Sequence, residues 1–291
     1  MAGNIKLVKY FLLPLFVLTL TVYIFLPNVQ AGLLVEFFDV GQGDSTFIQT
    51  SQGNQILIDG GPKSVIKQLS SVMPFYDRDL DLVILTHPHQ DHINGLIEVL
   101  KRYRVKQILL PEVVYDSSDY KEFLKLAEEK HVSSSYAFEG QRIYFDSSTV
   151  FDIYYPPKGE LHADSKAEGI NPKKINPNET SIVGKLSFGK TSFLFTGDIG
   201  TKVEELILPK YDLNADVLKV AHQGSKNSTS EDFVEEVTPE YSVISVGQNS
   251  YGHPTREIMD RLTQAGSQIF RTDNDGSVIF HSDGKTVERI K

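Results

Sequence analysis

The chain contains no cysteine among its 291 residues. This absence excludes disulfides, thiolate metal sites and a thiol nucleophile. It is compatible with export from a cell that does not rely on disulfides. A glycine-rich nucleotide-binding motif is also missing, because Gly41-Gln-Gly43 lacks the third glycine and the strand–helix context that such a motif needs. The sequence therefore predicts no organic cofactor.

Positive charge is in short supply, since 29 Lys and Arg stand against 38 Asp and Glu and the formal net charge is −9. An acidic surface gains nothing from counterion release, so the charge does not suggest tight, sequence-independent DNA binding. A local basic patch is still compatible with this balance. The remaining composition, 40% hydrophobic and 23% charged, is ordinary for a globular chain long enough to bury a core.

The N-terminal segment has one long uncharged and strongly apolar run, from Tyr10 to Leu26, after Lys6 and Lys9. It is read either as a signal peptide cleaved after Val29-Gln30-Ala31 or as an uncleaved single anchor in the membrane. A buried core helix is the third alternative. The basic flank places the N-terminus in the cytoplasm in the first two cases. We therefore expect a leader or anchor over residues 1–31 that contacts the membrane, and an extracytoplasmic domain over residues 32–291, either secreted or anchored.

Histidine is scarce, but three of the eight histidines fall in one short segment, His87-Pro-His89-Gln-Asp91-His92. The segment follows an apolar, strand-like run and precedes a helix-like run. Imidazoles two residues apart in a turn can face one cation, and a carboxylate and an imidazole at the helix start can face a second. Nitrogen and carboxylate ligands suit zinc, manganese or iron. The segment predicts a metal site, against the alternative of a polar loop with chance histidines.

Further polar side chains stand where other predicted strands end. Asp198 follows a strand-like run after Gly197, which lets the backbone turn sharply, and its carboxylate can bridge two metals. His222 ends another strand-like run, and His253 lies just before a helix-like run. A lone histidine is more often structural, but the repeated setting beside glycine favours metal ligands.

Two aspartates near the predicted centre are interpreted as supporting groups. Asp44 follows two glycines that allow close backbone approach, so that it can orient a metal-bound imidazole, with a tight hairpin turn as the alternative. Asp59 ends a strand-like run close to this region, and the same supporting role is preferred for it.

The strand-like and helix-like runs predict a mixed α/β fold. In both halves, strands come first and then alternate with amphipathic helices, which predicts two sheets stacked between helical layers. The expected strands are 33–39, 46–50, 55–59, 82–86, 107–110, 150–155, 181–188, 192–196, 217–221, 241–246, 268–272 and 278–281, and the expected helices are 93–103, 119–130, 202–208, 230–237 and 255–265.

Taken together, these residues resemble the metallo-β-lactamase superfamily. More closely, the chain is similar to the metallo-β-lactamase-like domain of ComEC-type DNA-uptake (competence) proteins and their stand-alone relatives. The resemblance covers nearly all of residues 33–291. Its motifs are Asp39-Val-Gly-Gln-Gly-Asp-Ser45, Leu57-Ile-Asp-Gly-Gly61, Leu85-Thr-His-Pro-His-Gln-Asp-His92, Asn178-Glu-Thr-Ser181, Leu194-Phe-Thr-Gly-Asp198, Leu218-Lys-Val-Ala-His-Gln-Gly-Ser225 and Tyr251-Gly-His-Pro254.

The resemblance implies an αββα sandwich of two mixed β-sheets flanked by helices, here preceded by one N-terminal hydrophobic helix. It also implies a centre of one or two divalent ions, zinc or manganese, at one edge between the sheets. Its ligands would be His87 and His89 on the first metal, Asp91, His92 and His253 on the second, and Asp198 between them. His222 would be either a further ligand or the proton donor.

One departure from the family pattern concerns the first metal. The superfamily usually has another histidine about twenty residues before the bridging aspartate, whereas this chain has Asn178 in that region. Asn178 can bind a metal only weakly or through water. We therefore expect a weaker first site, filled only by manganese or at high metal concentration.

The predicted activity is metal-assisted hydrolysis, in which Asp91 orients the nucleophile and His222 protonates the leaving group. The first hypothesis is an extracytoplasmic phosphodiesterase or nuclease, with DNA as a candidate substrate. The second is a hydrolase of another surface or small-molecule substrate, such as a cell-wall phosphodiester, a lactone or a β-lactam, which the acidic net charge favours. The third is a binding module of the same fold that has lost turnover. The sequence sets no expectation for the oligomeric state.

Overall fold

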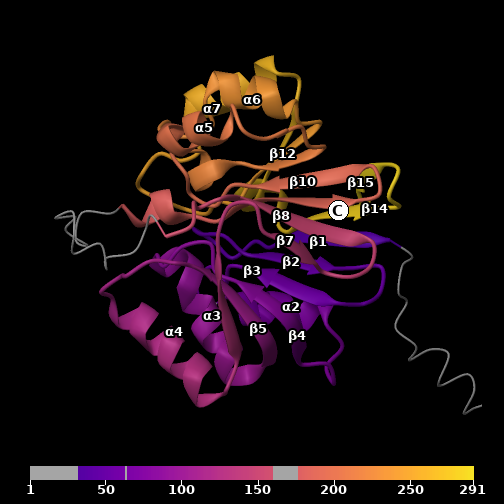
Figure 1. Ribbon diagram of the computed structural model, residues 1–291. Coiled ribbons are helices and arrows are strands. Elements are labelled where there is room, and N and C mark those ends of the chain that lie inside the picture. The colour runs from indigo at the N-terminus through magenta and orange to yellow at the C-terminus, as the bar shows by residue number, and fades with distance from the viewer. Residues whose placement is uncertain (1–31, 63, 160–175) are drawn as a thin grey trace, which may run out of the picture. The chain divides into compact units, whose positions relative to one another are not determined.

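Two β-sheets lie face to face at the centre of the computed structural model, which describes residues 32–62, 64–159 and 176–291 (Figure 1). Helices cover the outer face of each sheet, so that the layers follow the order helix, sheet, sheet, helix. The predicted αββα sandwich is confirmed. The predicted N-terminal hydrophobic helix falls within residues 1–31, outside the described residues.

The first sheet has eight strands among the described residues, in the order β15-β14-β1-β2-β3-β4-β5-β6. Its N-terminal strands form an antiparallel meander, and β3 to β6 are parallel, which makes the sheet mixed. The strands are β1 (Leu33–Phe37), β2 (Thr46–Gln49), β3 (Gln55–Ile58), β4 (Asp79–Ile84), β5 (Arg104–Pro111), β6 (Ser133–Ala137), β14 (Val278–Ser282) and β15 (Val287–Arg289).

Three helices connect the parallel strands of this sheet, as parallel pairing requires a crossover. They are α2 (Val65–Val72), α3 (Gln90–Arg102) and α4 (Ser118–Glu129). Apolar side chains recur along α3 at helical spacing, and Ile93, Leu96 and Leu100 are buried against the sheet. In the helix α4, the Ser117 hydroxyl accepts a hydrogen bond from the Tyr120 N–H and so caps the N-terminus.

The second sheet has seven strands in the described ranges, in the order β13-β12-β11-β10-β9-β8-β7, with β10 to β13 parallel. The strands are β7 (Arg142–Tyr144), β8 (Thr149–Tyr155), β9 (Val183–Phe188), β10 (Thr191–Phe195), β11 (Val217–Lys219), β12 (Tyr241–Ile244) and β13 (Gln268–Arg271). The helical elements of this half are α5 (Thr201–Ile207), α6 (Glu231–Val237), α7 (Arg256–Gln264), α8 (Thr272–Asp275) and the short 3₁₀ turns η2 (Pro177–Thr180) and η3 (Ala221–Gly224).

The hydrophobic core follows the layers. One cluster lies between the sheets and includes Phe37, Phe193 and Phe280, all at most 1% exposed. A second lies under α2 to α4 and a third under α5 to α7. Burying one such phenylalanine stabilises the fold by roughly 1.5–3 kcal/mol, so each of the three clusters contributes substantially to the stability of the sandwich. None of the helices in the described ranges is long and apolar enough to cross a membrane.

The parallel strands of both sheets direct the predicted site residues to one edge of the sandwich. His87 comes three residues after the end of β4, Asp198 three residues after β10, and His222 three residues after β11. The carboxyl ends of parallel strands are where α/β folds present ligand-binding groups. The main chain joins the halves here, where the Ile182 N–H donates to the Thr86 carbonyl at 3.0 Å.

Candidate metal centre

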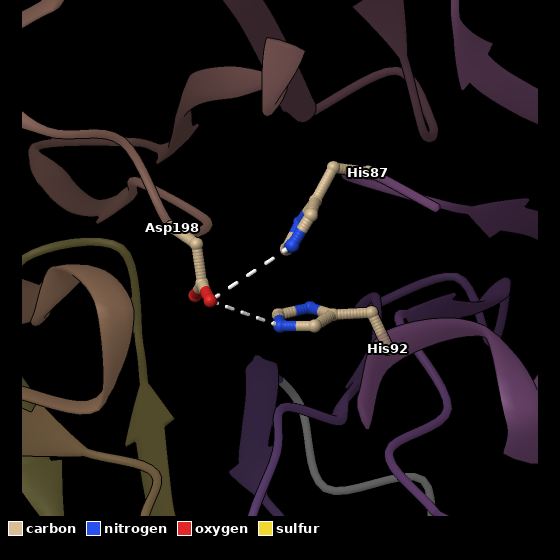
Figure 2. A group of neighbouring side chains, drawn as sticks. All are labelled: His87, His92 and Asp198. Carbon is tan, nitrogen blue, oxygen red and sulfur yellow. Dashed lines mark ion pairs between the residues drawn. The ribbon is translucent and has the colours of Figure 1, made fainter. Parts of the chain in front are cut away.

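Three buried side chains converge where the two halves of the sandwich meet. His87 and His92 come from the first half and Asp198 from the second, and Figure 2 shows both imidazole rings pointing toward the carboxylate. The Asp198 Oδ2 atom lies 3.9 Å from His87 Nε2 and 3.4 Å from His92 Nε2. The histidines are 0% exposed and Asp198 is 2% exposed. Side chains so far from water and so rich in cation ligands are unusual in a core.

The backbone around these ligands requires glycine at two points. Gly197, before Asp198, has a φ of +51°, and an added Cβ would lie 2.7 Å from the Ser181 Cβ. The Ser181 hydroxyl accepts from the Asp198 N–H at 3.1 Å and fixes the turn. In the other half, a Cβ on Gly95 of α3 would lie 1.8 Å from the Gly60 carbonyl oxygen. This close approach holds the first turn of α3, which carries His92, against the end of β3.

Asp59 orients His92 from behind. Its Oδ2 atom lies 2.8 Å from His92 Nδ1 and accepts from the Thr86 hydroxyl at 2.6 Å, while its Oδ1 accepts from the Thr86 N–H at 2.8 Å. A carboxylate on Nδ1 keeps a proton there and turns Nε2, the atom that would bind a cation, toward Asp198. Asp59 thus contacts the ring nitrogen of His92 that faces away from Asp198, and its supporting role at a metal stays a prediction. Its own φ of +57° is a strained conformation of the kind that clusters at functional sites.

Asp91 is tied to Asp198 by a side chain that the sequence analysis did not single out. The Gln223 amide donates to Asp91 Oδ2 at 3.1 Å and to Asp198 Oδ2 at 3.4 Å. Its own carbonyl accepts from the Gln42 amide at 2.9 Å, and the Gln42 carbonyl accepts from the Gly247 N–H at 3.1 Å. This chain of amides holds both carboxylates from behind.

The remaining predicted ligands surround an open cavity of about 390 Å³ next to the buried trio. His89 Nδ1 lies 3.2 Å from His87 Nε2, and His222 Nε2 lies 3.9 Å from Asp198 Oδ2. Asn178 contacts His222, with 3.4 Å between Nδ2 and Nε2. His253 stands further out, since its ring centroid is 5.6 Å from that of His222 and it forms no ion pair with the described residues. The structure therefore gathers the predicted site residues at one edge, with His253 on the far side of His222 in the cavity lining.

Asp44, also predicted as a supporting group, has another partner. The Lys219 ammonium of β11 donates to Asp44 Oδ2 and, at 3.1 Å, to the Gly197 carbonyl. It also lies 3.9 Å from Asp198 Oδ1, whereas Asp44 is 4.0 Å from His92 Nδ1. Both side chains of the pair are nearly inaccessible. Asp44 thus balances a buried ammonium, and the contact to His92 is secondary.

Burial and the surrounding charges set the protonation of these groups. Burial raises the pKa of Asp198, but His92, His87 and Lys219 outweigh it and hold that pKa well below its ordinary value. Burial lowers the pKa of His87 well below the usual range, with His92 adding to the effect. Burial also lowers the pKa of Lys219, but Asp44 and Asp198 bring it above its ordinary value. Burial lowers the pKa of His92, but Asp198, Asp59 and Asp91 raise it well above its ordinary value. A divalent cation that binds beside the anionic Asp198 and the neutral His87 would therefore displace a proton from His92.

The residues fit a divalent cation. His87, His92 and Asp198 each offer one ligand atom, and these atoms lie within 4.8 Å of one another. Three buried atoms facing this region, His92 Nε2, Asp198 Oδ1 and Asn178 Oδ1, have no hydrogen-bond partner among the described residues. Nitrogen and carboxylate oxygen suit zinc and other first-row cations. A second cluster, Asp44, Asp59 and His92, has similar spacing, but the Lys219 ammonium already supplies its positive charge.

Comparison with known proteins agrees with this geometry. The family model of the metallo-beta-lactamase superfamily matches residues 38–248. The chain belongs to the metallo-β-lactamase superfamily. The chain is thus a hydrolase of this superfamily, and its buried histidine–aspartate group is a candidate site for a divalent metal.

Among its relatives, the chain is 29% identical to ComE operon protein 3 of Bacillus subtilis strain 168 over 84% of its own length and 32% of that protein. It is 30% identical to competence protein ComA of Neisseria gonorrhoeae, over 87% of its length and 33% of that protein. The chain thus spans about a third of the curated relatives it matches. The metallo-β-lactamase fold protein YhfI from Bacillus subtilis superimposes with a TM-score of 0.58 at 14% identity, covering 86% of this chain and 100% of YhfI, and so supports the fold.

Lys219, Gln223 and Gln42 are the members of the site that the sequence analysis missed. Lys219 had a usable signal, because it is the one charged residue in the apolar run from Val217 to Ala221. A charge inside a buried strand requires a partner. Gln223 and Gln42 carried no such signal, since each lies in a turn where a polar side chain is ordinary.

Proposed function

We propose that this chain is an extracytoplasmic, metal-dependent phosphodiesterase that cleaves DNA. The observation that carries the proposal is the buried, anionic Asp198 between His87 and His92, open on one side to a cavity lined by further histidines. The relatedness to competence proteins supports DNA as the substrate. The uncharged run from Tyr10 to Leu26 after two lysines supports a location outside the cytoplasm, secreted or anchored.

The roles of the side chains follow from their positions. His87, His89 and Asp198 would hold one cation, and Asp91, His92 and Asp198 a second, with zinc and manganese both compatible with the donors. When bound, a divalent cation lowers the pKa of a coordinated water and offsets the charge that develops on the phosphate.

Asp91 and His222 are the residues placed to move protons. Asp91 is half-buried, lines the cavity and is held by Gln223, so that it can orient the attacking water. His222 lines the same cavity on the side of Asn178 and is partly accessible, as a proton donor to a leaving group must be. His253 lines the cavity next to His222, with 5.6 Å between their ring centroids.

The test uses the purified full chain, stripped of metal with a chelator and then supplied with manganese or zinc. Cleavage of bis-p-nitrophenyl phosphate and of DNA is measured beside metal binding by calorimetry. The Asp198→Asn variant keeps the side-chain volume and removes the charge, while Asp260→Asn, at an exposed carboxylate on α7, is the matched control. We expect metal-dependent cleavage by the wild type and the control, and a loss of at least a hundredfold in Asp198→Asn.

Two outcomes contradict the proposal differently. If the protein binds manganese or zinc and cleaves neither substrate, the phosphodiesterase assignment is wrong and esters, lactones and β-lactams become the substrates to try. If no divalent cation binds, the chain is a binding module of the same fold.

A further inference from the structure

Two adjoining cavities meet over the candidate metal centre. The first has a volume of about 390 Å³ and the second about 320 Å³, within or near the usual range of ligand sites. Asn178, Asp198 and His222 line both cavities. Since these residues are at the centre, the cavities form two arms of one cleft that crosses it. A substrate much smaller than both arms would leave one of them unused.

The first arm presents an aromatic ring on a fixed loop. Tyr251 lines this arm and is 74% exposed, although its ring is large and mostly apolar. Its backbone is held by Asn249, whose Oδ1 accepts from the Tyr251 N–H at 3.1 Å and the His253 N–H at 3.0 Å. The Asn249 amide also donates to the Gly247 and His253 carbonyls, at 2.9 and 2.8 Å. An exposed ring on such a loop can stack on a planar ligand without ordering its backbone first.

The second arm carries one cation. Lys202, at the start of α5, is the sole lysine or arginine among the described residues that line this arm, and it forms no ion pair with the described part of the chain. Glu179 lines the same arm, so the local charge is not purely positive. In a chain of net charge −9, an unpaired ammonium beside the centre is a distinct contact point for an anion.

We propose that the cleft binds a single-stranded polynucleotide across the metal centre, with a base stacked on Tyr251 in the first arm and a flanking phosphate against Lys202 in the second. This inference rests on the proposed phosphodiesterase function and narrows its substrate. In a duplex the bases are already stacked on one another, so that their faces are not open to Tyr251. Stacking of unpaired bases on aromatic side chains, with cations along the backbone, is the general way in which proteins hold single strands.

Tyr251 and Lys202 are expected to affect the binding of a strand in different ways. Removing the Tyr251 ring should weaken binding of a base-bearing strand about 5- to 150-fold, the range that stacking of one base gives. It should do much less to an abasic strand of the same length, which keeps every phosphate and offers no base. Removing the Lys202 charge should weaken both strands by the same smaller factor and lower the salt dependence of binding.

The experiment compares Tyr251→Ala and Lys202→Gln in the full chain on a single-stranded oligodeoxynucleotide and an abasic oligomer of equal length. KM and kcat are measured with the supporting metal, and binding to metal-free protein is followed by the anisotropy of a fluorescein label on each oligomer. The controls are Tyr76→Ala and Lys285→Gln, an exposed tyrosine and an exposed lysine away from the cleft. We expect the Tyr251→Ala penalty in KM and Kd to be at least fivefold larger on the base-bearing strand.

The proposal is overturned if Tyr251→Ala weakens both oligomers equally, if Lys202→Gln behaves like Lys285→Gln, or if the wild type prefers duplex DNA. Failure of the proposed function is a separate result. A wild type that binds the base-bearing strand through Tyr251 but cleaves no phosphodiester would retain the cleft assignment and refute the enzymatic one. A wild type that does not bind the oligomer in either metal state refutes the cleft assignment.

Discussion

The buried pair between Lys219 and Asp44 allows a quantitative test of what holds the metal-free site together. The perturbation is Lys219→Met, which keeps most of the side-chain length and removes the ammonium. The Gly197 carbonyl, which Lys219 also contacts, keeps a second donor, the His222 N–H at 3.2 Å. Removing the ammonium therefore leaves Asp44 without its charged partner, and the Asp44 Oδ1 atom already has no hydrogen-bond partner among the described residues.

The magnitude follows from the burial of that carboxylate. Both side chains of the pair are at most 6% exposed, and breaking a buried pair by removing one partner costs about 3–5 kcal/mol. Burial raises the pKa of Asp44 to about 7 even against the charge of Lys219, so proton uptake by Asp44 keeps the cost toward the lower end of this range at pH 8. The double variant Lys219→Met with Asp44→Asn leaves no unpaired charge. Since a buried pair roughly breaks even against neutral residues of similar size, the double variant should lie within about 1–2 kcal/mol of the wild type. We thus expect the second substitution to restore most of the stability that the first removes.

The assay is urea unfolding at pH 8 with a chelator present, followed by circular dichroism. The slope with denaturant should stay constant across the variants, so that a shift in midpoint reports stability. Lys285→Met, at an exposed lysine, is the control. The reasoning fails if Lys219→Met costs less than about 1 kcal/mol, or if the double variant is as unstable as the single one.

Three further predictions follow from other contacts. Burial raises the pKa of Glu36 to about 7 from 4.5, with Lys291 partly opposing it. The stability of the wild type should therefore fall as the pH rises from 4.5 to 7. At pH 8, Glu36→Gln should be more stable than the wild type by up to about 3 kcal/mol in thermal or urea unfolding. An equal loss of stability in the wild type and in Glu36→Gln between pH 4.5 and 7 would contradict this prediction. Gly95→Ala should destabilise the fold by about 1–3 kcal/mol and weaken metal binding, because the added Cβ meets backbone atoms. Asn94→Ala, on the same helix, should have neither effect. Equal effects of the two substitutions would refute the packing argument. Gln223→Leu should lower the metal affinity measured by calorimetry about 10- to 100-fold, since it removes the donor to two carboxylates. Gln42→Leu should lower the metal affinity less. An unchanged affinity in Gln223→Leu would exclude a positioning role for Gln223.

The sequence predicted the parts of the fold that obey simple periodicity. The apolar run before His87 and the helical repeat after it indicate β4 and α3, although β4 spans Asp79–Ile84 rather than 82–86 and α3 begins at Gln90 rather than at Ile93. The expected strand 217–221 ends earlier, at Lys219, because the backbone turns left-handed at His222, with φ of +50°, and the chain forms η3 there. Such a turn is not visible in a sequence without glycine at the position.

Some elements were missed for physical reasons. Strand β6 is an edge strand with four exposed residues, so no apolar alternation marks it. The helix α2 has an apolar face, but its eight residues are fewer than a helical pattern needs to stand out. The residues of the candidate site also differ in how far a sequence pattern marks them. Its histidines are a scarce residue type and its aspartates stand beside glycines or a histidine, so the sequence could single them out as candidates. Gln223 acts through contacts with residues 25 and 132 positions away, which only the three-dimensional arrangement supplies.

The division of the ligands between the two sheets has a consequence for how the protein matures. Neither half can offer His87, His92 and Asp198 together, because the histidines belong to the first half and the aspartate to the second. A cation can therefore be captured with full affinity only after the sandwich has closed. Metal loading is then a late event, and the bound ion would join halves that are far apart along the chain. A chain exported before it folds would reach this state only outside the cytoplasm, so the metal supply of that compartment would decide which ion it carries.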